Sequence, residues 1–327
     1  MNLVALGQAR PRADWRYLAR IVAGLLLIGG CWAISWSRLR PISDFTFFPL
    51  WLGYILAVDA LVEWRSRTSL IARSGWRVVW LFLLSAPLWW TFELLNRLVG
   101  NWIYHEAHDY GRVARFLLSS LAFSTVMPVV LTTAELVRSF RLGWLRSLPA
   151  MPMTRGWLIG YHLARWLMVL ATAVWPDYAF PLVWLAHIFI IDPIGTALGA
   201  RSIGRYLARR DWSIVLNVAV GTLICGFFWE MWNIRAMPKW TYDIPHVDWL
   251  HIFEMPILGY GGYLPFGVEV YAFYALGRWI VERAGVMRFP EARVASEPAF
   301  RSGATESGGQ VFCRPDATSS PRSSGPT

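Results

Sequence analysis

Eight apolar runs, each close to the length of a bilayer-spanning helix, limit what this chain can fold into. They cover residues 18–36, 46–63, 76–98, 113–137, 157–175, 179–200, 212–234 and 251–281. About 20 apolar residues in a helix cross the roughly 30 Å of bilayer hydrocarbon, where only helices and closed barrels satisfy their backbone polar groups. The runs predict an all-α, polytopic integral membrane protein with about eight transmembrane helices. In the last run, Pro256 and Pro265 leave open whether it forms one helix or two half-helices.

The composition fits the same class. Only 16% of the 327 residues are charged, against about 25% in a typical soluble domain. The net charge of +10 comes from arginine, with Lys239 as the only lysine. A basic protein can be a nucleic-acid binder, but basic cytoplasmic loops explain the charge of a polytopic chain. We therefore expect the lipid bilayer as a partner and no nucleic acid.

The arginines also predict an orientation. Sixteen of them lie in the N-terminal arm and in the loops near 64–77, 138–155 and 201–210, whereas the alternate loops hold seven basic residues. Cytoplasmic loops of membrane proteins carry the excess of arginine and lysine. Both termini are therefore expected in the cytoplasm, and the expected location is a bacterial inner membrane.

Polar residues that are unusual for membrane spans recur at a nearly constant interval of 132 to 138 residues. The matched pairs are Asp59 and Asp192, Glu93 and Glu230, Asn96 and Asn233, Trp102 and Trp240, Tyr104 and Tyr242, and His108 and His246, and the prolines Pro49 and Pro181 follow the same interval. The interval predicts a duplicated unit of four spans. Because four is an even number, both units enter the membrane in the same sense, which predicts parallel repeats with a site at their interface.

The repeat divides the chain into five parts. A basic arm covers residues 1–16, the first four-helix unit 17–140, a cytoplasmic linker 141–156 and the second four-helix unit 157–284. Residues 285–327 are rich in Ser, Gly, Pro and Arg with no apolar period. Such a composition cannot bury a core, so this tail is expected to be disordered.

Carboxyl and amide side chains gather in the outer halves of the spans. Two glutamates occur late in outward-running spans, each followed three residues later by an asparagine on the same helix face, and a third glutamate follows a histidine by three residues. Acids inside a membrane are costly and usually functional, and a desolvated carboxyl group can donate a proton to a substrate. The candidate catalytic residues are Glu93, Asn96, Glu230, Asn233, His251 and Glu254.

Aromatic side chains surround these groups and are candidates for lining a cavity in which they would stabilise positive charge. The candidate substrate-binding residues are Trp229, Trp232, Trp240, Tyr242, Tyr260 and the deeper Glu269. Two other interpretations stay open. The aromatic residues could anchor the protein at the membrane interface, and the polar residues could form hydrogen bonds that hold helices together.

The histidines raise the question of a metal. His105 and His108, together with Glu106 and Asp109, offer several ligands, but they lie in an exposed loop and only His108 has a counterpart in the second unit. We expect no metal and no cofactor. The sequence contains no P-loop, Gly-x-Ser-x-Gly, Cys-x-x-Cys or Asp-rich diphosphate motif. That argues against nucleotide hydrolysis, serine hydrolysis and prenyl-diphosphate transfer.

Three short motifs of the second unit, Trp229-Glu230, Trp240-Thr-Tyr242 and Phe253-Glu254-Met-Pro256, resemble the integral-membrane lycopene cyclases of the heterodimeric bacterial and duplicated fungal type. That family has Trp-Asp in place of Trp-Glu and a Pro-x-Glu-Glu motif, and about three spans per unit. The resemblance covers about 45 residues. It implies a cofactor-free isomerase of carotenoid biosynthesis, with Glu230 or Glu254 as the proton donor, oriented by Asn233 and His251.

The expected function is therefore an intramembrane enzyme that uses buried carboxylic acids on an apolar isoprenoid, carotenoid or lipid substrate. One alternative is a small proton- or cation-coupled transporter or channel. Its route would be formed by Asp59, Asp192, Glu93, Glu230 and Glu269. The other alternative is a non-catalytic membrane subunit or assembly factor. Homo-oligomerisation is left open.

Overall fold

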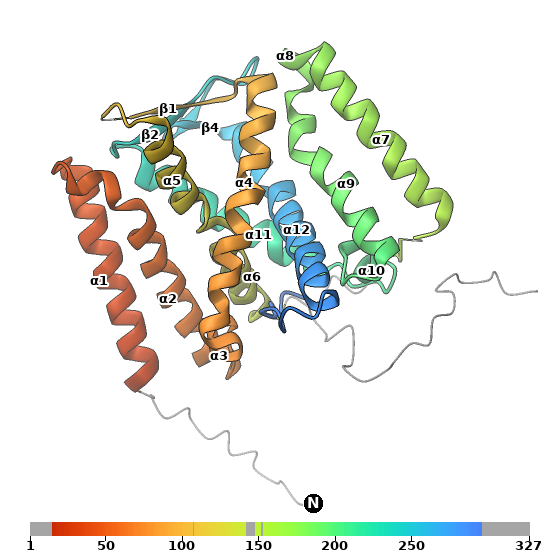
Figure 1. Cartoon of the computed structure of the whole chain (residues 1–327), viewed down its shortest axis with the longest axis horizontal. Helices are drawn as coiled ribbons and strands as arrows, with labels where there is room; N and C mark the ends of the chain where they lie inside the picture. Colours follow the sequence, from red (N-terminus) through yellow and green to blue (C-terminus); the bar gives the residue numbers. More distant parts are fainter. Residues whose placement is uncertain (1–14, 107, 142–147, 152, 296–327) are drawn as a thin grey trace, which may run out of the picture.

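The structure is a computed structural model that describes residues 15–106, 108–141, 148–151 and 153–295, and these residues are mostly helical (Figure 1). Seven helical segments among them are long and apolar enough to cross a membrane, which confirms an all-α, multi-pass membrane protein. The segments are α1 (Trp15–Ser37), α2 (Phe47–Ser66), α3 with α4 (Leu70–Ser74, Val79–Val99), α5 with α6 (Arg112–Phe123, Val126–Arg138), α7 (Arg155–Val174), α8 with α9 (Pro176–Ala179, Val183–Leu198) and α11 (Ser213–Asn233).

The eighth expected span begins later than predicted. Residues 251–262 form the short strands β3 (His251–Ile252) and β4 (Met255–Pro256), which pair with each other, and the 3-10 helix η5 (Ile257–Gly262). Only α12 (Tyr263–Arg283) is a long helix, and it is not among the seven apolar segments. Proline cannot continue a helical hydrogen-bond ladder, so Pro256 and the glycines after it delay the helix.

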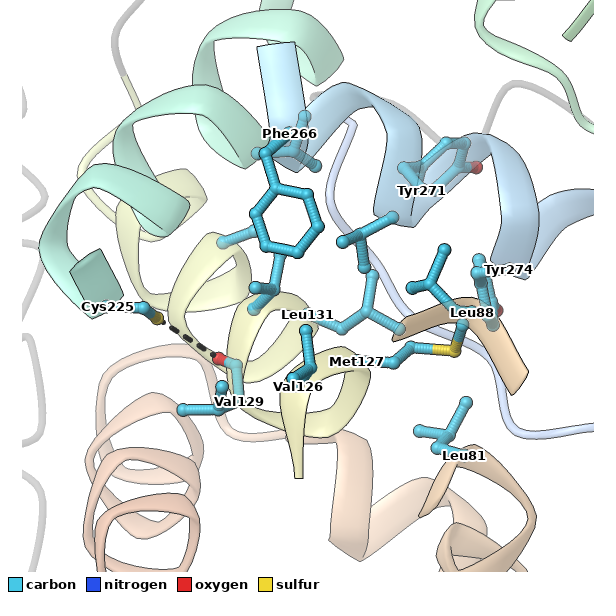
Figure 2. Packing of buried hydrophobic residues seen from close by; sticks show 14 of the residues in the cluster. Leu81, Leu88, Val126, Met127, Val129, Leu131, Cys225, Phe266, Tyr271 and Tyr274 are labelled. Carbon is cyan, nitrogen blue, oxygen red and sulfur yellow. Dashed lines mark hydrogen bonds between the residues drawn. The ribbon is translucent and has the colours of Figure 1, made fainter. Parts of the chain in front are cut away.

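Helix α6 lies at the centre of the bundle. Eleven of its thirteen residues are buried, including Thr132, Thr133 and Glu135, so neighbouring elements cover the helix on nearly every side. Figure 2 shows Val126, Met127, Val129 and Leu131 of this helix among residues of the neighbouring elements, with the Cys225 thiol of α11 directed at the Val129 carbonyl oxygen. Helix α11 packs against α6 and α12, and α12 packs against α9.

Glycines allow the closest helix contacts. A Cβ atom at Gly24 of α1 would lie 2.6 Å from the carbonyl oxygen of Gly53 in α2, so these two backbones touch. A Cβ atom at Gly267 of α12 would lie 2.4 Å from the carbonyl oxygen of Val218 in α11. Small residues at such crossings are typical of helix packing in membranes, where van der Waals contact drives association.

Two strands, β1 (Trp102–His105) and β2 (Lys239–Tyr242), follow α4 and α11 and pair antiparallel. Trp102 faces Tyr242 and Tyr104 faces Trp240 across the ladder. The two Trp-x-Tyr motifs, 102–104 and 240–242, therefore meet at one end of the bundle, which we call the strand end (Figure 1). The sequence analysis did not predict these strands.

The opposite end of the bundle carries the short helices α3 and α10 (Ile203–Leu207) (Figure 1). The Asp59 carboxylate accepts hydrogen bonds from the Ser69 hydroxyl at 2.7 Å and from the Ile71 backbone N–H at 2.9 Å. The Asp192 carboxylate accepts from the backbone N–H groups of Ile203 and Gly204, at 2.6 and 2.8 Å. Each aspartate thus fixes the start of a short helix, as capping carboxylates do.

Residues 285–295 extend across this opposite end as a packed segment. Phe289 and Val294 are buried, and the Asn217 side chain of α11 donates to the Val294 carbonyl oxygen at 2.7 Å. The described beginning of the expected disordered tail is therefore ordered, because its few apolar residues find a site on the bundle. The remainder of that tail, residues 296–327, most of the N-terminal arm, residues 1–14, and linker residues 142–147 and 152 lie outside the described residues.

Candidate functional site

The Glu93 carboxylate collects three hydrogen-bond donors near the end of α4. Its Oε1 atom accepts from the indole N–H of Trp89 at 2.8 Å, the indole N–H of Trp102 at 3.1 Å and the hydroxyl of Tyr104 at 2.7 Å. Trp89 lies one helical turn before Glu93, and the other two donors come from β1. The carboxyl group is therefore fixed in position by neutral donors.

Glu230 has the same kind of environment near the end of α11. Its Oε1 atom accepts from the hydroxyls of Tyr263 and Tyr242 at 2.6 and 2.7 Å, and from the Trp240 indole N–H at 3.4 Å. The side chain is fully buried, and Oε2 has no hydrogen-bond partner among the described residues. Glu93 and Glu230 therefore share a binding pattern but differ in exposure, because Glu93 is only partly buried.

The two asparagines position the strands. Asn96 donates from Nδ2 to the Trp102 carbonyl oxygen at 2.8 Å and accepts from the Trp102 N–H at 3.3 Å. Asn233 makes the same two bonds with Trp240, at 2.7 and 2.9 Å. Each asparagine thus holds the backbone of one Trp-x-Tyr motif. In this position the Trp and Tyr side chains of the motif point their N–H and O–H groups at the glutamate.

A cavity of about 710 Å³ lies between the two glutamate sites. Glu93 is on its wall, and Glu230 lies behind Tyr242 and Tyr263, which also face the cavity. Fifteen of its 34 lining residues are aromatic, and aromatic side chains with a few polar groups are usual in small-molecule sites. Six residues that the sequence assigned to the site line this cavity: Glu93, Trp229, Trp232, Asn233, Trp240 and Tyr242.

The remaining candidates lie elsewhere. Glu254 forms an ion pair with Lys239. Lys239 lines the cavity, whereas Glu254 does not. His251 contacts Asp248 at 2.8 Å rather than Glu254. The Tyr260 hydroxyl donates to the Ile252 carbonyl oxygen at 3.1 Å. The structure therefore does not bring Glu254 and His251 together as an acid–base pair.

Glu269 is buried in the bundle beside a histidine that the sequence analysis did not select. His187 Nδ1 lies 3.6 Å from Glu269 Oε1, and neither carboxylate oxygen has a hydrogen-bond partner within the described part of the chain. The imidazole packs on Phe92, with ring centroids 4.5 Å apart. Phe92 in turn packs on Phe266, which lines the cavity. The pair thus lies behind the aromatic wall.

Tyr104 and Tyr242 of the two strands keep their hydroxyl protons and act as hydrogen-bond donors. Burial and the neighbouring Glu93 raise the pKa of Tyr104 well above its ordinary value. Burial and Glu230 have the same effect on the pKa of Tyr242. Both phenols are therefore neutral at physiological pH and donate to the glutamates.

His105 at the end of β1, His108 in the loop before α5 and His246 after β2 have separate partners. His105 Nε2 lies 2.8 Å from the Thr241 hydroxyl, and His108 Nε2 lies 3.4 Å from Asp44 Oδ2. His246 stacks on Tyr178. Among the residues that the structure describes, no group of three or more His, Cys, Asp or Glu side chains is arranged to hold a metal ion.

Sequence reasoning missed Trp89, Tyr263 and His187. Trp89 carried a usable signal, because residues four apart share a helix face and Glu93 was already selected. Tyr263 and His187 have no such relation to the selected residues. No protein-family model, no curated protein and no solved structure matches this chain, so its function has to be inferred from the geometry of the site.

Proposed function

We propose that this protein is an intramembrane enzyme that uses Glu93 for cofactor-free acid–base chemistry on an apolar isoprenoid or lipid substrate. The observation that carries the proposal is the position of the Glu93 carboxyl group. It lies on the wall of an aromatic cavity of about 710 Å³ and is fixed by three neutral donors. Intramembrane acids are rare because they are costly, and they commonly mark functional sites.

The reaction class follows from these groups. Glu93 in its acid form gives its proton to one carbon of a substrate double bond, which leaves a cation on the other carbon and a carboxylate on the enzyme. Indole faces such as those of Trp89, Trp229 and Trp240 stabilise positive charge. A second double bond of the substrate then attacks the cation, and the cation formed loses a proton to the Glu93 carboxylate. The net reaction is an isomerisation.

In this account Glu230 is a positioning residue. It is sealed from the cavity, and its bonds to the Tyr242 and Tyr263 hydroxyls hold both phenol rings in the cavity wall. The resemblance to the lycopene cyclases supports a carotenoid or related isoprenoid as the substrate. Two of the three motifs that carry it meet at Glu230 through Trp240 and Tyr242.

The proposal includes the duplicated architecture. Matched hydrogen bonds at Glu93 and Glu230, at Asn96 and Asn233, and at Asp59 and Asp192 support two parallel four-helix units. The arginine-rich loops lie at the end opposite the strands, which supports cytoplasmic termini and a strand end on the outer side of a bacterial inner membrane.

The test is product analysis. The protein is expressed in a bacterial host that accumulates lycopene, and organic extracts of the cells and of the purified protein are analysed by mass spectrometry. We expect an isomerised isoprenoid of unchanged mass, or a co-purified isoprenoid. Extracts that contain only ordinary phospholipid, together with an unchanged pigment profile, would remove the support for this substrate class.

A second candidate function is proton-coupled transport, favoured by the buried pair of His187 and Glu269. Against it, residues 285–295 cross the end opposite the strands and form hydrogen bonds with α11, α12 and α6 there. Flux assays in proteoliposomes decide the question. Substrate flux that is lost in Glu269→Gln and retained in Glu93→Gln would favour the transporter.

A further inference from the structure

The cavity is apolar along one wall and polar near the exposed residues Glu106 and Arg115, a part that we call its mouth. Six of its polar residues come from two segments at the strand end, the 3-10 helix η1 (Ile42–Phe45) and the region from β1 into α5. They are Ser43, Asp44, Glu106, Tyr110, Arg115 and Ser119. A ligand that fills both parts needs an apolar body and one polar end.

Both cations that line the cavity are already neutralised. Arg115 Nε donates to both carboxylate oxygens of Glu106, at 2.8 and 2.9 Å, and Arg115 Nη2 donates to Asp109 at 3.2 Å. Lys239 is paired with Glu254. Recognition of a phosphate or carboxylate depends on charge-assisted bonds from such cations. The mouth therefore disfavours an anionic head group.

Asp44 offers an acceptor for a neutral head group. Its side chain is only 1% exposed. The Oδ1 atom accepts from the Ser43 hydroxyl at 3.3 Å, and the Oδ2 atom lies 3.4 Å from His108 Nε2 and accepts from the Tyr110 hydroxyl at 2.8 Å. Burial and this contact raise the pKa of Tyr110 to about 12, so the phenol stays a donor. A carboxylate has about four acceptor positions on its two oxygens. Tyr110 and His108 occupy those of Oδ2 and Ser43 one of Oδ1, which leaves one position on Oδ1 for an O–H donor from a ligand.

We propose that the substrate is an isoprenoid with an uncharged hydroxyl at one end, bound with the hydroxyl at Asp44 and the chain along the aromatic wall toward Glu93. The inference rests on the proposed function, because it concerns the same cavity. It also places the enzyme after a reaction that removes phosphate or introduces oxygen, since a prenyl diphosphate would not be accepted.

The test measures binding of three matched probes to the full-length protein in nanodiscs by quenching of tryptophan fluorescence. The probes share one C20 isoprenoid chain and end in a hydroxyl group, a diphosphate or a hydrogen atom. A hydrogen bond to a charged acceptor predicts that the alcohol binds about tenfold more tightly than the hydrocarbon. The diphosphate is expected to bind more weakly than the alcohol.

Single substitutions test whether Asp44 at the mouth causes the preference for the alcohol over the hydrocarbon. Asp44→Ala should bring the alcohol to the affinity of the hydrocarbon. Asp248→Asn changes a carboxylate that is 61% exposed, pairs with His251 and does not line the cavity, and it should leave the preference unchanged. Asp44→Asn, which keeps the side-chain volume, should lower the preference by about threefold. Glu254→Gln frees Lys239 and should raise the affinity for the diphosphate.

The outcomes separate this inference from the proposed function. Equal affinity of the wild-type protein for the alcohol and the hydrocarbon would overturn the head-group assignment, and so would tightest binding of the diphosphate. In either case Glu93-dependent turnover of a bound isoprenoid would leave the proposed function standing. Binding of the alcohol with no Glu93-dependent turnover would overturn the proposed function and leave the head-group site in place.

Discussion

The Tyr263 hydroxyl donates a hydrogen bond to Glu230 Oε1 at 2.6 Å and so joins the first residue of α12 to the last turn of α11. The phenol ring stacks on Trp229, with ring centroids 5.9 Å apart. It fits there because residue 226 is glycine. A Cβ atom at Gly226 would lie 2.4 Å from Cδ2 of the tyrosine ring.

This contact predicts the effect of Gly226→Ala. The added methyl group should displace the Tyr263 ring from the cavity wall, break its bond to Glu230 and lower turnover by about tenfold. Tyr263→Phe, which keeps the ring and removes the hydroxyl, should lower turnover to a similar extent. If both changes act through one bond, their effects in the double variant will not add. Full additivity in steady-state rates would contradict the role given to this bond.

Asn233→Ala should destabilise the protein by about 2 kcal/mol. The side chain is buried and satisfies both the N–H and the carbonyl group of Trp240, and a buried polar group that loses its partner costs about 1–3 kcal/mol. The measurement is chemical unfolding in detergent. Asn96→Ala is the matched variant of the first unit, and a smaller loss is expected there because Asn96 is only partly buried.

Glu269→Leu should raise stability by about 1–3 kcal/mol, because it removes a buried carboxyl group with no hydrogen-bond partner in the described part of the chain. Glu135→Leu provides the contrast. Its carboxylate binds the Arg73 side chain and the Arg293 backbone N–H, so that loss should cost about 3 kcal/mol. Thermal unfolding measures both. Loss of turnover in a well-folded Glu269→Leu protein would instead place this acid in the mechanism.

The packed segment 285–295 should loosen in acid. Burial alone would raise the pKa of Glu291, but Arg201 and Arg278 outweigh burial and lower the pKa below its ordinary value. The ion pairs therefore add stability that is fully present above about pH 4.3, the unfolded value. That stability is lost as the pH falls through the lower folded pKa. Limited proteolysis should show Glu291→Gln more accessible than wild type at neutral pH and equal to it in strong acid.

Hydropathy predicted the spans well because about 20 apolar residues in a row have few alternatives to a membrane helix. The repeat spacing also grouped Glu230 with Asn233, Trp240 and Tyr242, which the structure brings together. Both results come from patterns that are local in sequence or regular in spacing.

Contacts that depend on backbone turns could not be predicted in this way. His251 and Glu254 share a face only in a helix, but Phe253 adopts a positive φ of 59° and the segment becomes a β-hairpin. The packed start of the C-terminal tail was missed because two apolar residues, Phe289 and Val294, suffice when the bundle provides a site for them. Tyr263 was missed because its bond to Glu230 spans 33 residues.

Turnover by Glu93→Gln in nanodiscs, with product quantified by mass spectrometry, is the most direct test of Glu93 as the proton donor. Glutamine keeps the size of the side chain but cannot give a proton, so a loss of about 10²- to 10⁴-fold is predicted for a general acid. Glu63→Gln is the matched control, since Glu63 pairs with Arg20 near the far end of α2, and it should retain full turnover. Wild-type turnover by Glu93→Gln would contradict the account.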